Sequence, residues 1–179
     1  MNSKKLSATL LTLLTVVALP SLAGATPTRA TPDRTPVSSG PSRLLSTADE
    51  LAISQAFEDY GNGFIEEDAQ MLLDLWDTTD DLSYLPVESD TLMEDLSTLS
   101  TYYQALIAGI TIHSAAVTGL RIFPRGTDEA YVYGVYNWVY SYKPSGPVMS
   151  QPTRATFVMK KRNGQWRYVH FHESIRLVL

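Results

Sequence analysis

The chain has 179 residues, of which 44% are hydrophobic, and it carries a formal net charge of −5 and no cysteine. An acidic chain without a basic cluster is a poor nucleic-acid binder, because that affinity comes mainly from lysine and arginine neutralising phosphates. Without cysteine, a disulfide framework and a lipidated cysteine anchor are both excluded, so the fold depends on its hydrophobic core.

The first 25 residues have the pattern of a cleavable signal peptide. Two lysines precede an apolar stretch from Leu6 to Leu19, Pro20 interrupts it, and small residues end at Ala25. The apolar stretch is shorter than the roughly 20 residues needed to cross a bilayer. We therefore expect cleavage after Ala25, a secreted or periplasmic location, and no stable membrane anchor on the mature protein.

Residues 26–46 are rich in proline, threonine and serine, and four spaced prolines in them disfavour both helix and sheet. This composition predicts a disordered linker. The folded domain is then expected over residues 47–179, a normal size for a single hydrophobic core.

Three helices are predicted at the start of this domain. Thr47 and Glu50 have the spacing of a capping box, and apolar residues then recur at helical spacing over residues 48–65. Asp68 is expected to cap a short second helix with Leu72 and Trp76 on its apolar side. A capping box at Thr91 and Glu94 predicts a third helix that ends at Gly109.

After Gly109 the composition is typical of β-strands. Four strands are predicted, separated by short turns, over residues 110–123, 129–142, 153–162 and 165–176. The pair Asn163–Gly164 favours a tight hairpin, because both residues tolerate positive φ. Short turns make successive strands antiparallel, so we expect an α+β fold in which three helices pack on one face of a curved antiparallel sheet of four long strands.

This order, with a short extended segment around Leu82–Val87, resembles the cone-shaped nuclear transport factor 2-like superfamily, which includes ketosteroid isomerases and SnoaL-like cyclases. The closing segment Arg154–Ser174 resembles the ending of SnoaL-like domains. It also resembles the association domain of calcium/calmodulin-dependent protein kinase II, which shares a Gly-x-Trp-x-x-Val-His-Phe-His-x-Ser pattern. The resemblance implies a cavity between the helices and the sheet, and a homodimer formed through the sheet face.

The kinase association domain lines its cavity with arginines that correspond here to Tyr136, Phe157 and Glu173. None of these residues is basic, so we do not expect the acidic ligand that such arginines suit. Strand alternation places many aromatic residues on the helix-facing side of the sheet. They predict either a packed core or a pocket for a small organic ligand, lined by Tyr60, Trp76, Tyr84, Tyr103, Tyr136, Trp138, Phe157 and Phe171.

Glu173 and Asp81 are the candidate catalytic residues. A carboxylate on the inner face of the sheet would have a raised pKa and could transfer protons, as related enzymes do beside a tyrosine. The alternative for Glu173 is a surface ion pair with an arginine, for which Arg154, Arg167 and Arg176 are available. The acidic group Asp74, Asp77, Asp80 and Asp81 is alternatively a solvated face.

His170 and His172 point to the same side of the last strand, but no third ligand stands at a diagnostic spacing, so a metal is not expected. We expect them on the outer face of the sheet, in hydrogen bonds or in a subunit contact with Tyr131, Tyr133, Asn137 and Tyr168. Motifs for nucleotides, calcium or a serine nucleophile are absent from the sequence, and we expect no cofactor.

Three functions follow from these observations and remain open at this point. The first is an exported domain that binds an uncharged or weakly cationic organic molecule. The second is an acid–base enzyme of the isomerase, cyclase or dehydratase type that needs no cofactor. The third is an assembly module that works through its sheet face.

Overall fold

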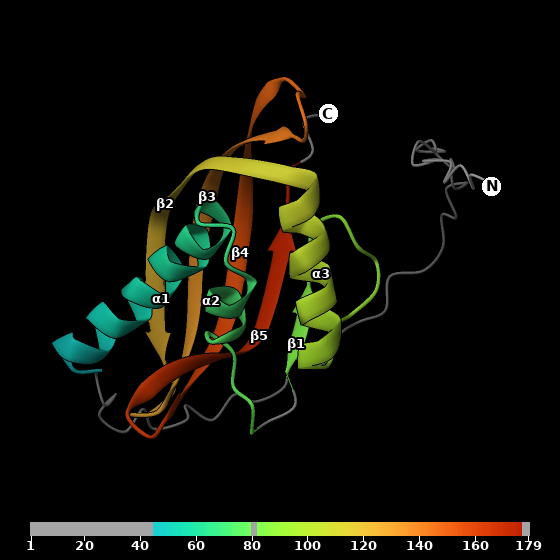
Figure 1. The fold of residues 1–179 in the computed structure, drawn as a ribbon. Helices are drawn as coiled ribbons and strands as arrows, with labels where there is room; N and C mark the ends of the chain where they lie inside the picture. The colour runs from blue at the N-terminus through green and yellow to red at the C-terminus, as the bar shows by residue number, and fades with distance from the viewer. Residues whose placement is uncertain (1–44, 80–81, 177–179) are drawn as a thin grey trace, which may run out of the picture. The chain divides into compact units, whose positions relative to one another are not determined.

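The computed structural model describes residues 45–79 and 82–176 of the chain, and Figure 1 shows their arrangement. The expected signal peptide and the linker as far as residue 44 lie outside the described residues. Helices α1 (Thr47–Ile65), α2 (Ala69–Leu73) and α3 (Leu96–Gly109) cover one face of a curved sheet. Among the described helices, none is long and apolar enough to span a bilayer.

The sheet has five strands in the order β1-β5-β4-β3-β2. The strands are β1 (Ser83–Leu85), β2 (Ile110–Pro124), β3 (Glu129–Tyr142), β4 (Val148–Arg162) and β5 (Gln165–Ser174). The four long strands pair antiparallel as predicted, whereas the short β1 pairs with β5 in parallel. The α+β class is confirmed, and the expected antiparallel sheet of four strands is corrected to a mixed sheet of five.

The helix starts differ from the predicted capping boxes. Ser46 caps α1 through its hydroxyl, which accepts from the backbone N–H of Asp49, so the box lies one residue earlier than expected. Asp95 caps α3 through Thr98, and the predicted box at Thr91 and Glu94 is wrong. Asp68 caps α2 as predicted. Serine, threonine and aspartate are all good N-caps, so several adjacent polar residues give the same signal in the sequence. Which of them caps the helix depends on where the chain turns in the fold.

The folded domain also begins earlier than the expected boundary at residue 47. Ser46 is the N-cap of α1, and the side chain of Leu45 is buried in the core with only 7% of its surface exposed. The last residues of the expected linker are therefore part of the domain.

Strand β4 begins at Val148, five residues before the predicted start. Its first residues pair only with β3, because β5 ends at Ser174, opposite Arg154. Pro152 lies in this single-sided part, opposite Asn137. A proline is tolerated on such an edge, so it did not end the strand there.

The hairpin between β4 and β5 is the one predicted: Asn163 and Gly164 have φ values of 51° and 82°. Beyond it, however, a β-bulge changes the register. Val158 pairs with His170 and Met159 pairs with Tyr168, which leaves Val169 without a residue opposite. A bulge reverses the alternation of faces, so Tyr168 is fully buried on the inner face, and its predicted place on the outer face is wrong.

Two tyrosine hydroxyls of the sheet fix α1 in place. The hydroxyl of Tyr136 donates to the carbonyl of Phe57 at 2.8 Å, and that of Tyr168 donates to the carbonyl of Ala56 at 2.5 Å. The helix approaches β2 closely at Gly61, where an added Cβ atom would lie 2.8 Å from the Cβ atom of Ala115. This close packing holds the C-terminal half of α1 over the middle of the sheet.

Candidate functional site

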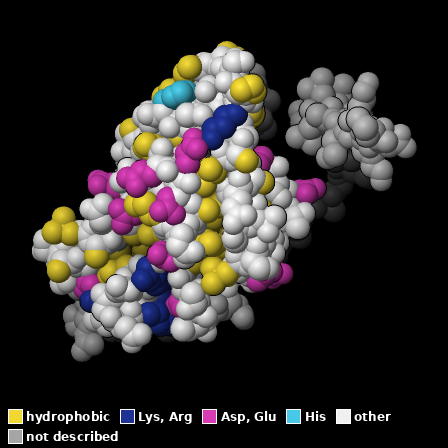
Figure 2. All heavy atoms as spheres, viewed as in Figure 1, with side chains coloured by type: hydrophobic (Ala, Val, Ile, Leu, Met, Phe, Trp, Pro, Cys, Tyr) yellow, Lys and Arg dark blue, Asp and Glu magenta, His cyan; other side chains and the backbone are white. Residues whose placement is uncertain are grey.

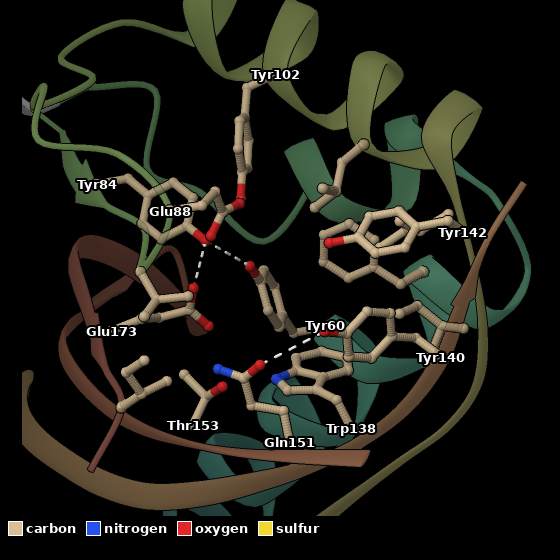
Figure 3. A pocket seen from close by; sticks show the side chains of 16 residues that line it. Tyr60, Tyr84, Glu88, Tyr102, Trp138, Tyr140, Tyr142, Gln151, Thr153 and Glu173 are labelled. Carbon is tan, nitrogen blue, oxygen red and sulfur yellow. Dashed lines mark hydrogen bonds between the residues drawn. The ribbon is translucent and has the colours of Figure 1, made fainter. Parts of the chain in front are cut away.

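A cavity of about 440 Å³ lies between α3 and the inner face of the sheet (Figure 3). Every helix except α2 and all five strands contribute to its wall, together with the loop after β1 and the residues after β5. The lining residues are Tyr60, Phe64, Tyr84, Val87, Glu88, Tyr102, Leu106, Ile110, Ile112, Trp138, Tyr140, Tyr142, Gln151, Thr153, Glu173 and Ile175. The volume is in the range of small-molecule binding sites.

A chain of three hydrogen-bonding groups lies in one wall of this cavity. The hydroxyl of Tyr84, on β1, donates to Oε2 of Glu173, near the end of β5, over 2.9 Å. The hydroxyl of Tyr60, on α1, lies 3.0 Å from that of Tyr84. Since Tyr84 has one proton and gives it to the carboxylate, Tyr60 donates to Tyr84. When Glu173 is protonated, its own O–H group can donate to Tyr84, and Tyr84 can then donate to Tyr60.

Burial raises the pKa of Glu173 from its ordinary value of 4.5 to about 8. The side chain is only 7% exposed, and Glu88 adds a like charge nearby, whereas the hydrogen bonds from Tyr84 and from the backbone of Val87 act in the opposite direction. A carboxyl group with a pKa close to the working pH can both accept and release a proton. The predicted place of Glu173 on the inner face agrees with the structure, and the alternative of a surface ion pair is wrong.

The arginines considered for that ion pair are occupied elsewhere or exposed. Arg154 donates to the carbonyl of Ile175, and Arg167 donates to the carbonyl of Asp74. Arg176 is exposed. The partner of Glu173 is Tyr84 instead.

A second carboxylate, Glu88, lies at the cavity on the loop after β1. It accepts a short hydrogen bond from the hydroxyl of Tyr102 on α3. The burial of Tyr102 and the charge of Glu88 both raise the pKa of Tyr102 well above its ordinary value, so the hydroxyl keeps its proton. Figure 3 shows Glu88, Tyr102, Tyr84 and Glu173 gathered on one side of the cavity.

The predicted pocket residues divide into two groups. Tyr60, Tyr84 and Trp138 line the cavity. The other five form the packed aromatic core next to it: Trp76, Tyr103, Tyr136, Phe157 and Phe171. The indole of Trp76 donates to the hydroxyl of Tyr103 at 3.0 Å, and the rings of Phe157 and Phe171 stack 3.8 Å apart. The sequence offered core and pocket as alternatives, and the structure contains both.

Asp81, the second candidate catalytic residue, lies outside the described residues, as does Asp80. Asp77 is not part of a solvated face, because its carboxylate is 2% exposed and binds Arg162 at 3.1 Å and the hydroxyl of Thr79 at 2.7 Å. Other acidic side chains do gather over α1 and α2 on the helical face (Figure 2).

His172 is exposed, and Nδ1 of His170 lies 2.8 Å from the hydroxyl of Ser83 on the neighbouring strand. Within the part of the chain that the structure describes, no group of three potential ligands is arranged to hold a metal ion.

Glu88 and Tyr102 are among the polar residues of the site that sequence reasoning missed. The apolar stripe of α3 selects Tyr103, which is buried in the core, and its neighbour Tyr102 falls outside that stripe. Glu88 lies in a loop whose path depends on the pairing of β1 with β5, and no local pattern marks it. Both residues become recognisable only when the loop and α3 are brought together.

The fold and the site define an α+β domain whose helices enclose an aromatic cavity over a curved sheet. The sequence model of the SnoaL-like domain family matches residues 53–177, and the chain belongs to this family. The resemblance to the nuclear transport factor 2-like superfamily is thereby confirmed. No curated protein is similar enough in sequence to match the chain.

Solved structures share the fold at low sequence identity. A proposed dehydratase of the NTF2-like family from Streptomyces avermitilis has a TM-score of 0.62 at 19% identity, covering 73% of this chain and 98% of its own. A ketosteroid isomerase-like protein from Erwinia carotovora atroseptica has a TM-score of 0.63 at 16% identity, covering 74% and 100%. A proposed calcium/calmodulin-dependent protein kinase II association domain from Xanthomonas campestris has a TM-score of 0.56 at 22% identity, covering 71% and 87%. At these identities the likeness shows the fold alone.

Proposed function

We propose that this protein binds a small organic molecule in the aromatic cavity and that Glu173 transfers a proton to or from the bound molecule. The single observation that carries the proposal is the position of Glu173, whose buried carboxyl group lines a cavity of about 440 Å³ and hydrogen-bonds to Tyr84. Buried titratable groups in a cavity, with a pKa shifted by burial and a neighbouring charge, are typical of functional sites.

Proton transfer is favoured by the chain of hydroxyls behind Glu173. In the ionised form Glu173 can take a proton from a C–H bond beside an electron-withdrawing group of the ligand, and in the protonated form it can give one to a leaving group. Tyr84 can keep its hydrogen bond to the carboxyl group in either state, and Tyr60 can keep its hydrogen bond to Tyr84, because hydroxyls both donate and accept. The oxygen atoms can therefore stay in place when the proton moves, and only the hydroxyl hydrogens reorient.

The similar structures favour chemistry of this kind, since they include a proposed dehydratase and a ketosteroid isomerase-like protein. Reactions of that class move protons at carbon and oxygen without a cofactor. Binding without turnover is the second candidate, and the apolar wall of the cavity favours it on its own, since residues such as Ile112, Leu106 and Trp138 provide burial for a ligand but no reactive group.

Thermal-shift measurements with a panel of small aromatic and steroid-like compounds test the binding step. We expect at least one compound to raise the melting temperature, and we expect Glu173→Gln to change that shift. Glu58→Gln, an exposed change on α1, is the matched control and should leave the shift unchanged. A panel without a single binder would refute the proposal.

The proton-transfer step is tested with the best binder of that panel in D₂O. Deuterium incorporation at its C–H bonds, followed by NMR, should be accelerated by the wild type and by Glu58→Gln but not by Glu173→Gln. If the compound binds but the protein accelerates neither exchange nor turnover, the proposed binding function stands and the proposed proton transfer is refuted.

We propose further that the protein acts outside the cytoplasm, on the basis of the signal-peptide pattern in residues 1–25. Expression of the full chain with analysis of the exported fraction should yield a mature protein that begins at Thr26. A protein retained in the cytoplasm with its first residues intact would contradict this.

We also propose that the outer face of the sheet forms a homodimer. Phe123 and Tyr131 lie opposite each other on β2 and β3 and are 47% and 40% exposed, which is high for large aromatic side chains. Light scattering should give a dimer for the wild type and a monomer for Tyr131→Glu, and a monomeric wild type at working concentration would exclude the dimer.

A further inference from the structure

The charged groups at the cavity all have the same sign. Two carboxyl groups, Glu88 and Glu173, are among the lining residues, whereas no lysine, arginine or histidine of the described chain is among them. Of the lysine and arginine residues adjacent in sequence to lining residues, Arg154 donates to the carbonyl of Ile175, Lys143 binds Glu67 and the carbonyl of Ile107, and Arg176 is exposed. A ligand that enters the cavity therefore meets negative charge without a compensating cation.

Aromatic rings form the largest part of the wall around these carboxyl groups. Seven of the sixteen lining residues are aromatic: Tyr60, Phe64, Tyr84, Tyr102, Trp138, Tyr140 and Tyr142. Burial raises the pKa of Tyr60, Tyr84, Tyr102 and Tyr140, so these rings are neutral. Neutral aromatic faces next to carboxylates are the surroundings in which proteins hold organic ammonium groups.

We propose that the ligand of this cavity is an organic cation, an ammonium group attached to an aromatic or aliphatic body, held with its charge beside Glu88 and Glu173. This inference rests on the proposed binding function and narrows it to one ligand class. The alternative classes fit less well. An anion would be repelled by Glu88, and also by Glu173 wherever that group is ionised. A neutral molecule that fills the cavity would remove water from Glu88 without replacing its interactions.

The two ends of the cavity match the two ends of such a molecule. The carboxyl groups lie together with the hydroxyls of Tyr84 and Tyr102 on one side, and Trp138, Tyr140 and Tyr142 lie on the other (Figure 3). Leu106 and Ile112 add aliphatic surface to the wall. The ammonium group fits the first side and the apolar body the second.

A cation should also change the ionisation of Glu173. The groups that act on this carboxyl come from every element around it: Tyr60 on α1, Tyr84 on β1, Glu88 on the following loop, Tyr102 and Tyr103 on α3, and Tyr136 on β3. The tyrosines stay neutral, so Glu88 is the charged one. A bound cation favours the ionised form of Glu173, and its affinity should rise as the pH rises through the pKa of about 8.

The test uses a matched pair of probes, benzyltrimethylammonium and neopentylbenzene, which have the same shape and differ in the charge of one atom. Benzyltrimethylammonium does not titrate, so any pH dependence of its binding belongs to the protein. The tryptophan fluorescence of the protein, to which Trp138 at the cavity contributes, or an NMR titration of the full protein gives the dissociation constants. We expect the cation to bind at least about tenfold more tightly than the neutral probe, and roughly tenfold more tightly at pH 9 than at pH 7.

Variants assign the effect to the two carboxyl groups. Glu173→Gln should weaken cation binding and abolish its pH dependence, and Glu88→Gln should weaken it while the pH dependence remains. Neither change should weaken the neutral probe by a comparable factor, and the exposed control Glu58→Gln should change nothing.

Equal binding of the two probes, or cation binding that weakens as the pH rises, overturns the organic-cation inference while the proposed binding function stands. If neither of the two probes nor any compound of the panel binds, the proposed binding function itself is refuted.

Discussion

The cost of keeping Glu173 inside the fold gives the sharpest prediction. Its pKa is about 8 in the folded protein and 4.5 ordinarily, so the folded state holds the proton more tightly than the unfolded state. The stability contributed by the protonated group is fully present below pH 4.5 and is lost as the pH rises towards 8. The difference of about 3.5 pH units, at about 1.4 kcal/mol for each, sets an upper limit of roughly 5 kcal/mol.

Glu173→Gln removes this dependence, because glutamine keeps the shape and can still accept from Tyr84 but does not ionise. The variant should match the wild type near pH 4.5 and be more stable by several kcal/mol above pH 8. Urea denaturation of both proteins at a series of pH values measures the difference, with Glu58→Gln as control. Two parallel curves of unfolding free energy against pH would show that Glu173 ionises freely in the folded state and would refute the reasoning.

Three further changes have defined outcomes. Tyr84→Phe removes a hydrogen bond that lowers the pKa of Glu173, so an NMR titration should place that pKa above its wild-type value. Gly61→Ala should destabilise the fold by about 1–3 kcal/mol in chemical denaturation, although alanine favours helices, because the new methyl group meets Ala115; a gain in stability would contradict the packing. Asp49→Asn should lower the melting temperature most above about pH 4, and the difference from the wild type should shrink steadily as the pH falls below that, because the unfolded chain then takes up a proton that the ion pair with Lys161 keeps off Asp49 in the folded protein.

Local patterns predicted those parts of the fold that local chemistry determines. The helical spacing over residues 48–65, the Asn163–Gly164 hairpin and the order of the elements are all found in the structure. Each of these features depends only on residues close together in the chain. The helix follows from the period of its apolar residues, the hairpin from the φ values that a tight turn needs, and the antiparallel pairing from the short connections.

The residues placed wrongly depend on contacts between distant segments. The bulge at Val169 turns Tyr168 inward. It cannot be predicted from the rule that successive side chains of a regular strand point to opposite faces. Periodicity likewise identified the inner face of the sheet, but not which of its residues line the cavity and which belong to the packed aromatic core next to it. Glu88 and Tyr102 belong to the site only because β1 pairs with β5 and brings the following loop against α3.

The hydroxyl of Tyr84 determines which side chains position 173 can accept. It accepts and donates with equal ease, so the group at position 173 can change its charge while the aromatic surroundings stay as they are. If an arginine stood at position 173 instead, its guanidinium would find an acceptor in the hydroxyl oxygen of Tyr84 that now serves as donor. We therefore expect the side chain at position 173 to be exchangeable for one of another charge without loss of its hydrogen bond to Tyr84.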